Sequence, residues 1–227
     1  MTPLKLRGVK RIPFLLVAAA VAFAAGKPHV ISFGRVMVVA WFTGENEVQK
    51  RELKVRGLFV DSKLREYTMG EIHEVTDRLF VVRRVYRIND SLPGETSAPR
   101  WKWQRDGWLL VDRETGRFAQ LKLPEFDATY SAASWYRDYI AYCGVSEDGS
   151  KLFAVVAELG RHKAVVRKAL GTAHGTGEPD SECPAPEWQR QPAQVTFHVP
   201  GAAPLSFEVR GTAAEIVVPD ESGDEDK

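Results

Sequence analysis

The feature that most constrains the fold is residues 135–170, where three apolar runs of strand length are separated by short polar turns. The runs span residues 139–145, 151–159 and 164–170 and are rich in residues that strands favour. An Asp-Gly pair at 148–149 separates the first two runs, and glycine adopts the left-handed backbone of a tight hairpin without steric conflict. The segment therefore predicts a three-stranded antiparallel meander.

The remainder of the chain carries the same strand pattern. Residues 195–199 and 205–209 alternate apolar and polar positions on either side of a turn, which is the pattern of an amphipathic hairpin. After residue 25, no apolar spacing of 3.6 residues persists over two helical turns. We therefore expect an all-β fold built from antiparallel hairpins and meanders.

Residues 1–24 have the three regions of a secretory signal peptide. An apolar segment at 12–22 is followed by Ala-Phe-Ala at 22–24, which has the small residues of a cleavage site. A membrane anchor is the alternative, but a spanning helix needs about 20 apolar residues and the run at 12–25 is shorter. We expect export to the periplasm or beyond the cell, with no membrane span after cleavage. The preceding basic segment contains Lys5, Arg7, Lys10 and Arg11.

The charge distribution separates a folded body from a tail. The full chain has a net charge of +1, to which the signal peptide contributes four cations. Residues 219–227 carry five acids, one lysine and no apolar residue to bury, so we expect a disordered acidic tail. Residues 25–218 then form an all-β domain of nearly balanced charge. Such a domain has no overall bias toward nucleic acid, and we expect no nucleic-acid partner.

The two cysteines, Cys143 and Cys183, predict one disulfide, because bridges form and persist in exported proteins. Closing a loop of this length stabilises a fold by about 4 kcal/mol in the chain-entropy description, before strain is subtracted. The alternative is a buried free thiol at Cys143 and a surface thiol at Cys183. The compartment favours the bridge.

Three segments that lead into predicted strands begin with similar residues, which indicates an irregular internal repeat. A packing solution recurs wherever the same unit recurs, whereas a ligand site is usually built once. We therefore expect the repeated tryptophans to be mostly buried and the Arg-Asp pairs to be structural. The repeated residues are Trp103, Arg105 and Asp106, then Trp135, Arg137 and Asp138, and then Trp188 and Arg190.

Two predicted hairpins carry similar turn sequences. Residues 145–156 read Val-Ser-Glu-Asp-Gly-Ser-Lys-Leu-Phe-Ala-Val-Val, and residues 112–118 read Asp-Arg-Glu-Thr-Gly-Arg-Phe. Both resemble the central hairpin of β-propeller blades, of the kind found in periplasmic TolB-like and WD40-like repeats, although the Trp-Asp dipeptide is absent. The resemblance implies blade-like packing. We therefore expect the hairpins to form a small or incomplete propeller, with a β-sandwich as the alternative.

Aromatic residues are the main candidates for a binding surface. Rings presented by a sheet offer a large contact area at low entropy cost, and they stack on sugars or hold peptides. The alternative is that the rings fill the space between sheets. The candidate ligand contacts are Trp101, Trp108, Tyr130 and Tyr136.

Carboxylates provide the one enzymatic alternative. A glycoside hydrolase needs two acids at a suitable separation, and four acids lie in or near the aromatic-rich residues 126–142. Because surface acids are common, this pattern ranks below a binding role. The four acids are Glu125, Asp127, Asp138 and Glu147.

No motif indicates a metal, a cofactor or a nucleophile. The five histidines show no metal-ligand spacing, and Ser146 lies in a predicted hairpin turn without the Gly-x-Ser-x-Gly pattern. The glycine-rich residues 171–177 lack the Lys-Ser/Thr of a phosphate-binding loop. We therefore expect no metal, no cofactor and no catalytic residue.

The densest basic group is interpreted in two ways. It is either a contact for an anion or polysaccharide, or a set of ion pairs with acids on neighbouring strands, and we favour the ion pairs. The cations are Arg83, Arg84, Arg87, Lys102 and Arg105, and the acids are Asp90, Asp106 and Asp112.

These patterns favour an exported, non-catalytic binding or scaffolding module of the cell envelope, with a protein or glycan ligand. The alternative is a secreted hydrolase that acts on glycans through paired carboxylates. The two classes differ in geometry, because a hydrolase needs two facing carboxylates in a concave pocket and a binder needs a ligand-accessible aromatic surface.

We predict that the mature protein begins near Ala25. The signal peptide should be removed at the Ala-Phe-Ala site during export. N-terminal sequencing of exported protein should therefore recover a first residue close to Ala25, and recovery of Met1 would contradict the assignment.

Overall fold

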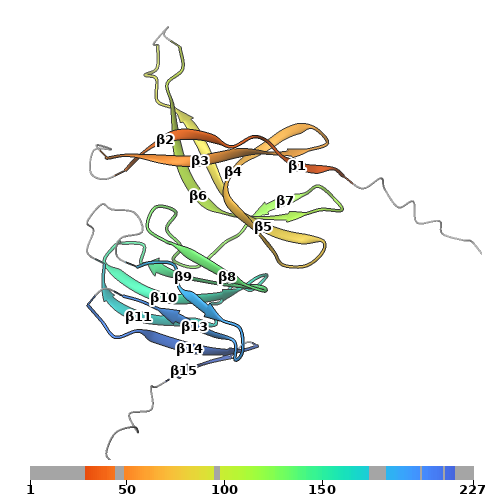
Figure 1. Cartoon of the computed structure of the whole chain (residues 1–227). Helices are drawn as coiled ribbons and strands as arrows, with labels where there is room; N and C mark the ends of the chain where they lie inside the picture. Colours follow the sequence, from red (N-terminus) through yellow and green to blue (C-terminus); the bar gives the residue numbers. More distant parts are fainter. Residues whose placement is uncertain are drawn as a thin grey trace, which may run out of the picture.

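The computed structural model describes residues 29–43, 49–94, 98–173, 183–199, 201–211 and 213–217 (Figure 1). These residues form fifteen strands and no helix, which confirms the predicted all-β class. The strands belong to three sheets, which we call A, B and C in chain order. The predicted signal peptide and acidic tail lie outside the described residues.

Sheet A is a seven-stranded sheet that curls strongly. Its pairing follows the order β1-β3-β2-β6-β5-β4, with β7 added to β6 and a further pairing between β3 and β4. β2 and β6 meet at the single parallel pair Trp41 and Trp103. The strands are β1 (Ile31–Phe33), β2 (Met37–Thr43), β3 (Gln49–Val60), β4 (Lys63–Glu74), β5 (Leu79–Asn89), β6 (Trp101–Asp112) and β7 (Phe118–Gln120).

Sheets B and C are four-stranded antiparallel meanders in which consecutive strands pair. The predicted meander is confirmed as β9, β10 and β11, and one further strand, β8, completes sheet B. Sheet B contains β8 (Ala133–Tyr136), β9 (Tyr139–Val145), β10 (Lys151–Glu158) and β11 (Val166–Thr172). Sheet C contains β12 (Glu187–Gln189), β13 (Gln194–Phe197), β14 (Leu205–Arg210) and β15 (Ala213–Val217). A propeller-like or sandwich-like arrangement of these sheets stays a prediction.

Sheet B lies between the other two sheets and is covered on both faces (Figure 1). Ile140 and Tyr142 of β9 pack toward Val81 and Trp108 of sheet A. Ala141 and Cys143, whose side chains point to the opposite face of β9, pack toward the core of sheet C. Successive side chains of a strand point to opposite faces, so a strand covered on both faces needs an unbroken apolar run. This explains why residues 139–145 and 151–158 do not alternate in polarity.

The interior of curled sheet A is filled by two apolar clusters. One cluster lies near the pair between β2 and β6, and the other lies toward the β6–β7 end. Their buried members are Trp41, Leu53, Val55, Val85 and Trp103 in the first, and Leu58, Phe80, Val82, Leu109 and Val111 in the second. Sheet A therefore has a core of its own and uses its outer face to contact sheet B.

The predicted ion pairs of the basic group are formed in part. Arg84 pairs with Asp106 at 2.9 Å, and Lys102 pairs with Asp90 at 3.0 Å. Asp112 pairs instead with Arg78, which holds the pKa of that carboxyl below its usual range. These pairs link neighbouring strands of sheet A, as the sequence predicted.

Of the three segments that begin with Trp103, Trp135 and Trp188, the last two occupy equivalent positions in the fold. Trp135 lies in the short strand β8, and Trp188 lies in the short strand β12; each strand leads through a turn into the next strand of its sheet. Trp103 instead lies near the start of the 12-residue strand β6. Trp103 is buried, and the other two are partly buried, so none of the three is an exposed ring.

The Arg-Asp part of the segments does not recur as one interaction. Asp106 pairs with Arg84 of the neighbouring strand. Arg137 is exposed in a left-handed turn conformation with φ 54°, and the Asp138 carbonyl accepts a hydrogen bond from the Leu159 N–H. The similarity of these segments is therefore one of aromatic packing, and Asp106 and Asp138 make different contacts.

We predict that Trp135→Ala destabilises the protein by about 3 kcal/mol, because the ring fills space between sheets A and B. It packs edge-on against Trp108 at 5.3 Å and stacks on His73 at 5.6 Å between ring centroids. The Trp135 indole N–H has no hydrogen-bond partner, so Trp135→Phe should cost much less. Trp101→Ala is the control, because that ring is 49% exposed. Chemical denaturation measures the free energy of unfolding of all three variants. Equal losses of stability for Trp135→Ala and Trp101→Ala would contradict the packing role of Trp135.

Candidate functional site

A pocket of about 180 Å³ opens beside the turn between β9 and β10, and we call it the disulfide pocket. One wall is the bridge between Cys143 and Cys183. Its polar lining is Asp127, Tyr130, Ser146 and Glu147, and its apolar lining includes Val145, Leu152 and Ala173. The pocket therefore combines two carboxylates, a hydroxyl and an aromatic ring against a covalently fixed wall.

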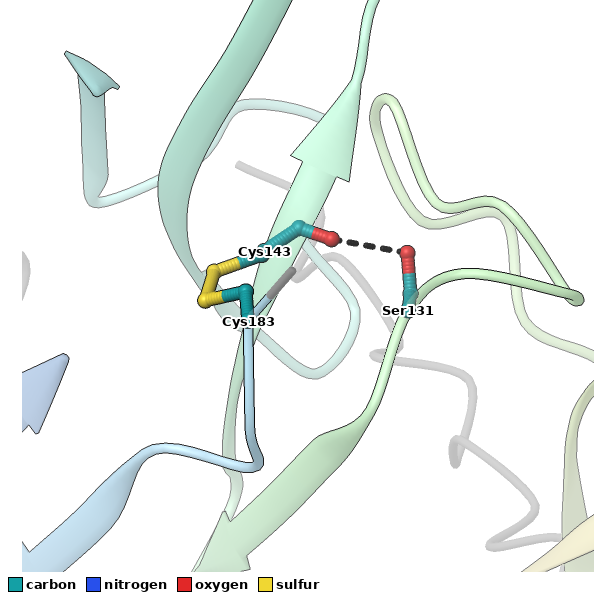
Figure 2. Close-up of a disulfide and its surroundings, with 3 residues drawn as sticks. All are labelled: Ser131, Cys143 and Cys183. Carbon is teal, nitrogen blue, oxygen red and sulfur yellow. Dashed lines mark hydrogen bonds between the residues drawn. A yellow bond between two sulfur atoms is a disulfide. The ribbon is translucent and has the colours of Figure 1, made fainter. Parts of the chain in front are cut away.

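The predicted disulfide is confirmed, with the Cα atoms of Cys143 and Cys183 6.2 Å apart (Figure 2). Both cysteines are almost completely buried. The bridge ties β9 of sheet B to the chain just before β12, and so fixes the start of sheet C against the central sheet. A structural disulfide is consistent with an oxidising compartment outside the cytosol.

Ser131 connects the disulfide to the loop before sheet B. Its hydroxyl donates to the Cys143 carbonyl at 2.8 Å (Figure 2) and accepts a hydrogen bond from the Asp127 N–H at 3.0 Å. The Asp127 carboxylate accepts hydrogen bonds from the N–H groups of Thr129 and Tyr130 at 2.7 and 2.8 Å. This carboxylate therefore closes its own turn and orients Tyr130 at the pocket.

Two arginines of sheet A hold the same loop from the other side. The Arg83 guanidinium is buried and donates to the carbonyl oxygens of Asp106 at 3.2 Å, Ser131 at 3.0 Å and Ala128 at 2.7 Å. Arg105 donates to the Thr129 carbonyl. The sequence predicted carboxylate partners for the basic group, but Arg83 and Arg105 also bind main-chain oxygens. Sequence cannot reveal such partners, because every residue carries a carbonyl.

Gly144 lets the loop approach β9 closely. The Val145 N–H donates to the Glu125 carbonyl at 2.8 Å, and a Cβ on Gly144 would lie only 3.0 Å from that carbonyl oxygen. Tyr142 donates to the Pro124 carbonyl at 2.6 Å, and burial raises the pKa of this phenol far above its usual range. The loop is thus held against β9 near its start by Pro124 and Glu125 and near its end by Ser131.

The four candidate carboxylates are separated by the fold. Asp127 and Glu147 line the disulfide pocket together. Glu125 makes a two-point ion pair with Arg167, with contacts of 2.5 and 2.9 Å, and Asp138 lies in the turn between β8 and β9. Of the four carboxylates considered for catalysis, two, Asp127 and Glu147, therefore lie together in a concave site.

The turn at the pocket rim is held by its own side chains. Ser146 bonds to Asp148 at 2.5 Å and accepts a hydrogen bond from the Lys151 N–H at 2.9 Å, so its predicted role as a turn residue is confirmed. Hydrogen bonds from Ser146 and Ser150 lower the pKa of Asp148 to about 2. Because this pKa is depressed in the folded state, the turn keeps its full stability above the ordinary carboxyl pKa and loses it as the pH falls toward 2.

The four candidate aromatic contacts do not form one surface. Tyr130 lines the disulfide pocket, and Trp101 is exposed on the hairpin of β5 and β6. Trp108 is buried between sheets A and B, so its ring is a core residue and is not available to a ligand. Tyr136 stacks on Trp188 at 5.3 Å and donates to the Arg190 carbonyl.

Sequence reasoning found Asp127, Tyr130, Glu147 and the disulfide separately, but it did not place them in one pocket. Nor did it identify Val145, Leu152 or Ala173 as lining residues. These residues come from the loop before β8, the β9–β10 hairpin and the end of β11. Only the pairing of β9 with β10 and the folding of the loop onto β9 could bring them together.

Comparison of the chain with protein-family models, with curated proteins and with solved structures gives no match. Within the described ranges, no cluster of three or more His, Cys, Asp or Glu side chains has the geometry to hold a metal ion. The described part of the chain also contains no helix of the length and apolarity needed to cross a membrane.

We predict that Gly144→Ala destabilises the protein by about 1–3 kcal/mol, because the added methyl group must displace the Glu125 backbone or Val155. Gly107→Ala is the matched control in a strand of sheet A, because its Cβ would meet only the Gln120 side chain at 3.6 Å. Urea denaturation compares the free energies of unfolding of the two variants, provided that both have the same m-value. A Gly144 variant as stable as the Gly107 variant would show that the loop does not depend on this close approach.

Proposed function

We propose that the protein is an exported, non-catalytic binding module of the cell envelope, and that the disulfide pocket holds one unit of a larger ligand. The observation that carries the proposal is the preformed pocket, which joins an oriented aromatic ring to two carboxylates against a disulfide wall. A wall fixed by a covalent bond lowers the ordering cost of binding.

The chemistry of the lining favours a sugar unit over an apolar side chain. The Tyr130 ring offers a surface on which the apolar face of a sugar can stack. Asp127 and Glu147 offer carboxylate oxygens to sugar hydroxyl groups. A glycan is therefore the proposed ligand, and a protein ligand is the other class that the sequence left open.

The size of the pocket supports binding of one unit. Pockets that enclose a whole small-molecule ligand measure about 300–1,000 Å³, whereas the disulfide pocket measures about 180 Å³. The remainder of a chain-like ligand would lie on the surface outside it. A pocket of this size therefore suits a protein that recognises a polymer by holding one of its sugar units.

The hydrolase alternative keeps one specific observation in its favour, since Asp127 and Glu147 share a pocket. However, the Asp127 carboxylate already accepts two main-chain hydrogen bonds that close its turn. Both hydrogen bonds are accepted by Asp127 Oδ1, so this oxygen is committed to the turn rather than to a catalytic step. This supports binding without cleavage.

Export is supported by two independent features. The first is the signal-peptide pattern of residues 1–24. The second is the buried disulfide, a bond that persists mainly in oxidising compartments.

We predict that the mature protein binds N-acetylglucosamine or glucose hexamers without cleaving them. In an NMR titration, the amide signals of residues 127–130 and 145–149 should shift, because these residues form the pocket. Tyr130→Ala should weaken binding by about tenfold or more, as expected for the loss of a stacked ring. Tyr86→Ala is the control, since that ring is exposed on β5 away from the pocket.

Chromatography of the same mixtures separates the alternatives. Shortened products that disappear in Glu147→Gln would support the hydrolase. Absence of both shifts and products with either oligosaccharide would contradict a ligand built from these sugars and favour a protein ligand.

A further inference from the structure

A second hollow has a volume of about 410 Å³ and is lined by residues just before β1, at the β3–β4 turn and at the β6–β7 turn of sheet A. Four basic side chains line it, and we call it the cationic groove. They come from three separate parts of the chain, which the fold of sheet A brings together. Its charged lining is His29, Asp61, Lys63, Arg65 and Arg117.

The groove carries an excess of positive charge. Asp61 is the one acid in the lining, and it is already engaged by His29 at 2.6 Å and by the Val30 N–H at 3.0 Å. No ion pair within the described ranges joins Arg65 or Arg117 to an acid. Lys63, Arg65 and Arg117 carry three positive charges against the carboxylate of Asp61, which leaves an excess of two before His29 is counted.

The shape of the groove is fixed by close packing. Gly116 has φ +61°, and a Cβ at this position would lie 2.8 Å from Val60 and 3.0 Å from the His29 ring. The β6–β7 turn can therefore lie against β1 and β3 only with glycine at this place. The Arg65 guanidinium lies over the Phe118 ring at 5.5 Å, which restrains its orientation.

We propose that the cationic groove binds a phosphate monoester group. Two arginines supply planar pairs of donors that match phosphate oxygens, and Lys63 adds a point charge. The excess of two positive charges matches a phosphate monoester, which carries about −1.5 to −2 at pH 7, better than a singly charged carboxylate. The groove is larger than a phosphate group, so part of the attached molecule also fits.

The experiment is an NMR titration of the mature, disulfide-bonded protein in low-salt buffer with inorganic phosphate and with glucose 6-phosphate. Glucose, and chloride at matched ionic strength, are the reference additions. The amide signals of residues 61–65 and 115–118 should shift with both phosphates and not with glucose or chloride. Tighter binding of glucose 6-phosphate would identify an ester of a larger molecule as the source, and equal binding would identify free phosphate.

Charge-changing variants test the assignment. Arg65→Gln and Arg117→Gln should each weaken binding by about threefold or more, as expected for one exposed ion pair. Asp61→Asn should strengthen binding, because it removes the only carboxylate and asparagine tolerates the left-handed backbone of that turn. Lys168→Gln, which removes an exposed charge from β11, should have no effect.

Three results would overturn the proposal: no shifts with either phosphate, equal shifts with chloride, or equal weakening by Lys168→Gln and Arg117→Gln. The first result would show that the groove does not bind phosphate, and either of the other two would show that it has only the general attraction of a basic surface. Sugar hexamers that bind the disulfide pocket provide an independent readout, so failure here does not affect the proposed function. Folding of each variant is checked by its amide spectrum away from the groove.

Discussion

Burial of the Arg83 guanidinium between sheet A and the loop before sheet B is the interaction on which the rest of the structure depends. A buried charge without partners costs several kcal/mol, so the loop must hold its carbonyl groups where the guanidinium can reach them. Arg83 donates to two carbonyls of this loop and one of β6. The loop in turn positions Tyr130 and Asp127 and delivers the chain to β8. One side chain thus determines both the packing of two sheets and one side of the disulfide pocket.

The central position of sheet B limits where a binding site can lie on it. Both of its faces are covered, one by sheet A and the other by sheet C. Only the ends and edges of the sheet remain accessible, and the disulfide pocket lies at the end formed by the β9–β10 turn. The disulfide at this end joins the central sheet to the chain that enters sheet C. The pocket therefore has a wall that cannot move independently of the core.

The disulfide pocket and the cationic groove are both built by turns but differ in chemistry. The disulfide pocket presents carboxylates, a hydroxyl and an aromatic ring, which suits uncharged polar groups. The cationic groove presents two arginines and a lysine around an engaged carboxylate, which suits an anion. Rigid strands hold turns from distant parts of the chain in fixed positions, and this is how loops come to carry binding sites.

The sequence by itself determined the all-β class, the meander at β9–β11 and the cysteine pair, because these depend on local polarity patterns and on there being only two cysteines. The apolar runs of β9 and β10 predicted strands, but not that these strands are covered on both faces or which sheets cover them. Tertiary structure alone decided that Trp108 is a core residue, that Arg83 binds carbonyls, and that Asp127 and Glu147 share a pocket while Glu125 pairs with Arg167. It also brought Arg117 beside Lys63 and Arg65. The physical reason is that residue type and spacing fix which face of a strand a side chain occupies, whereas its neighbours across a loop or between sheets depend on how distant segments pack.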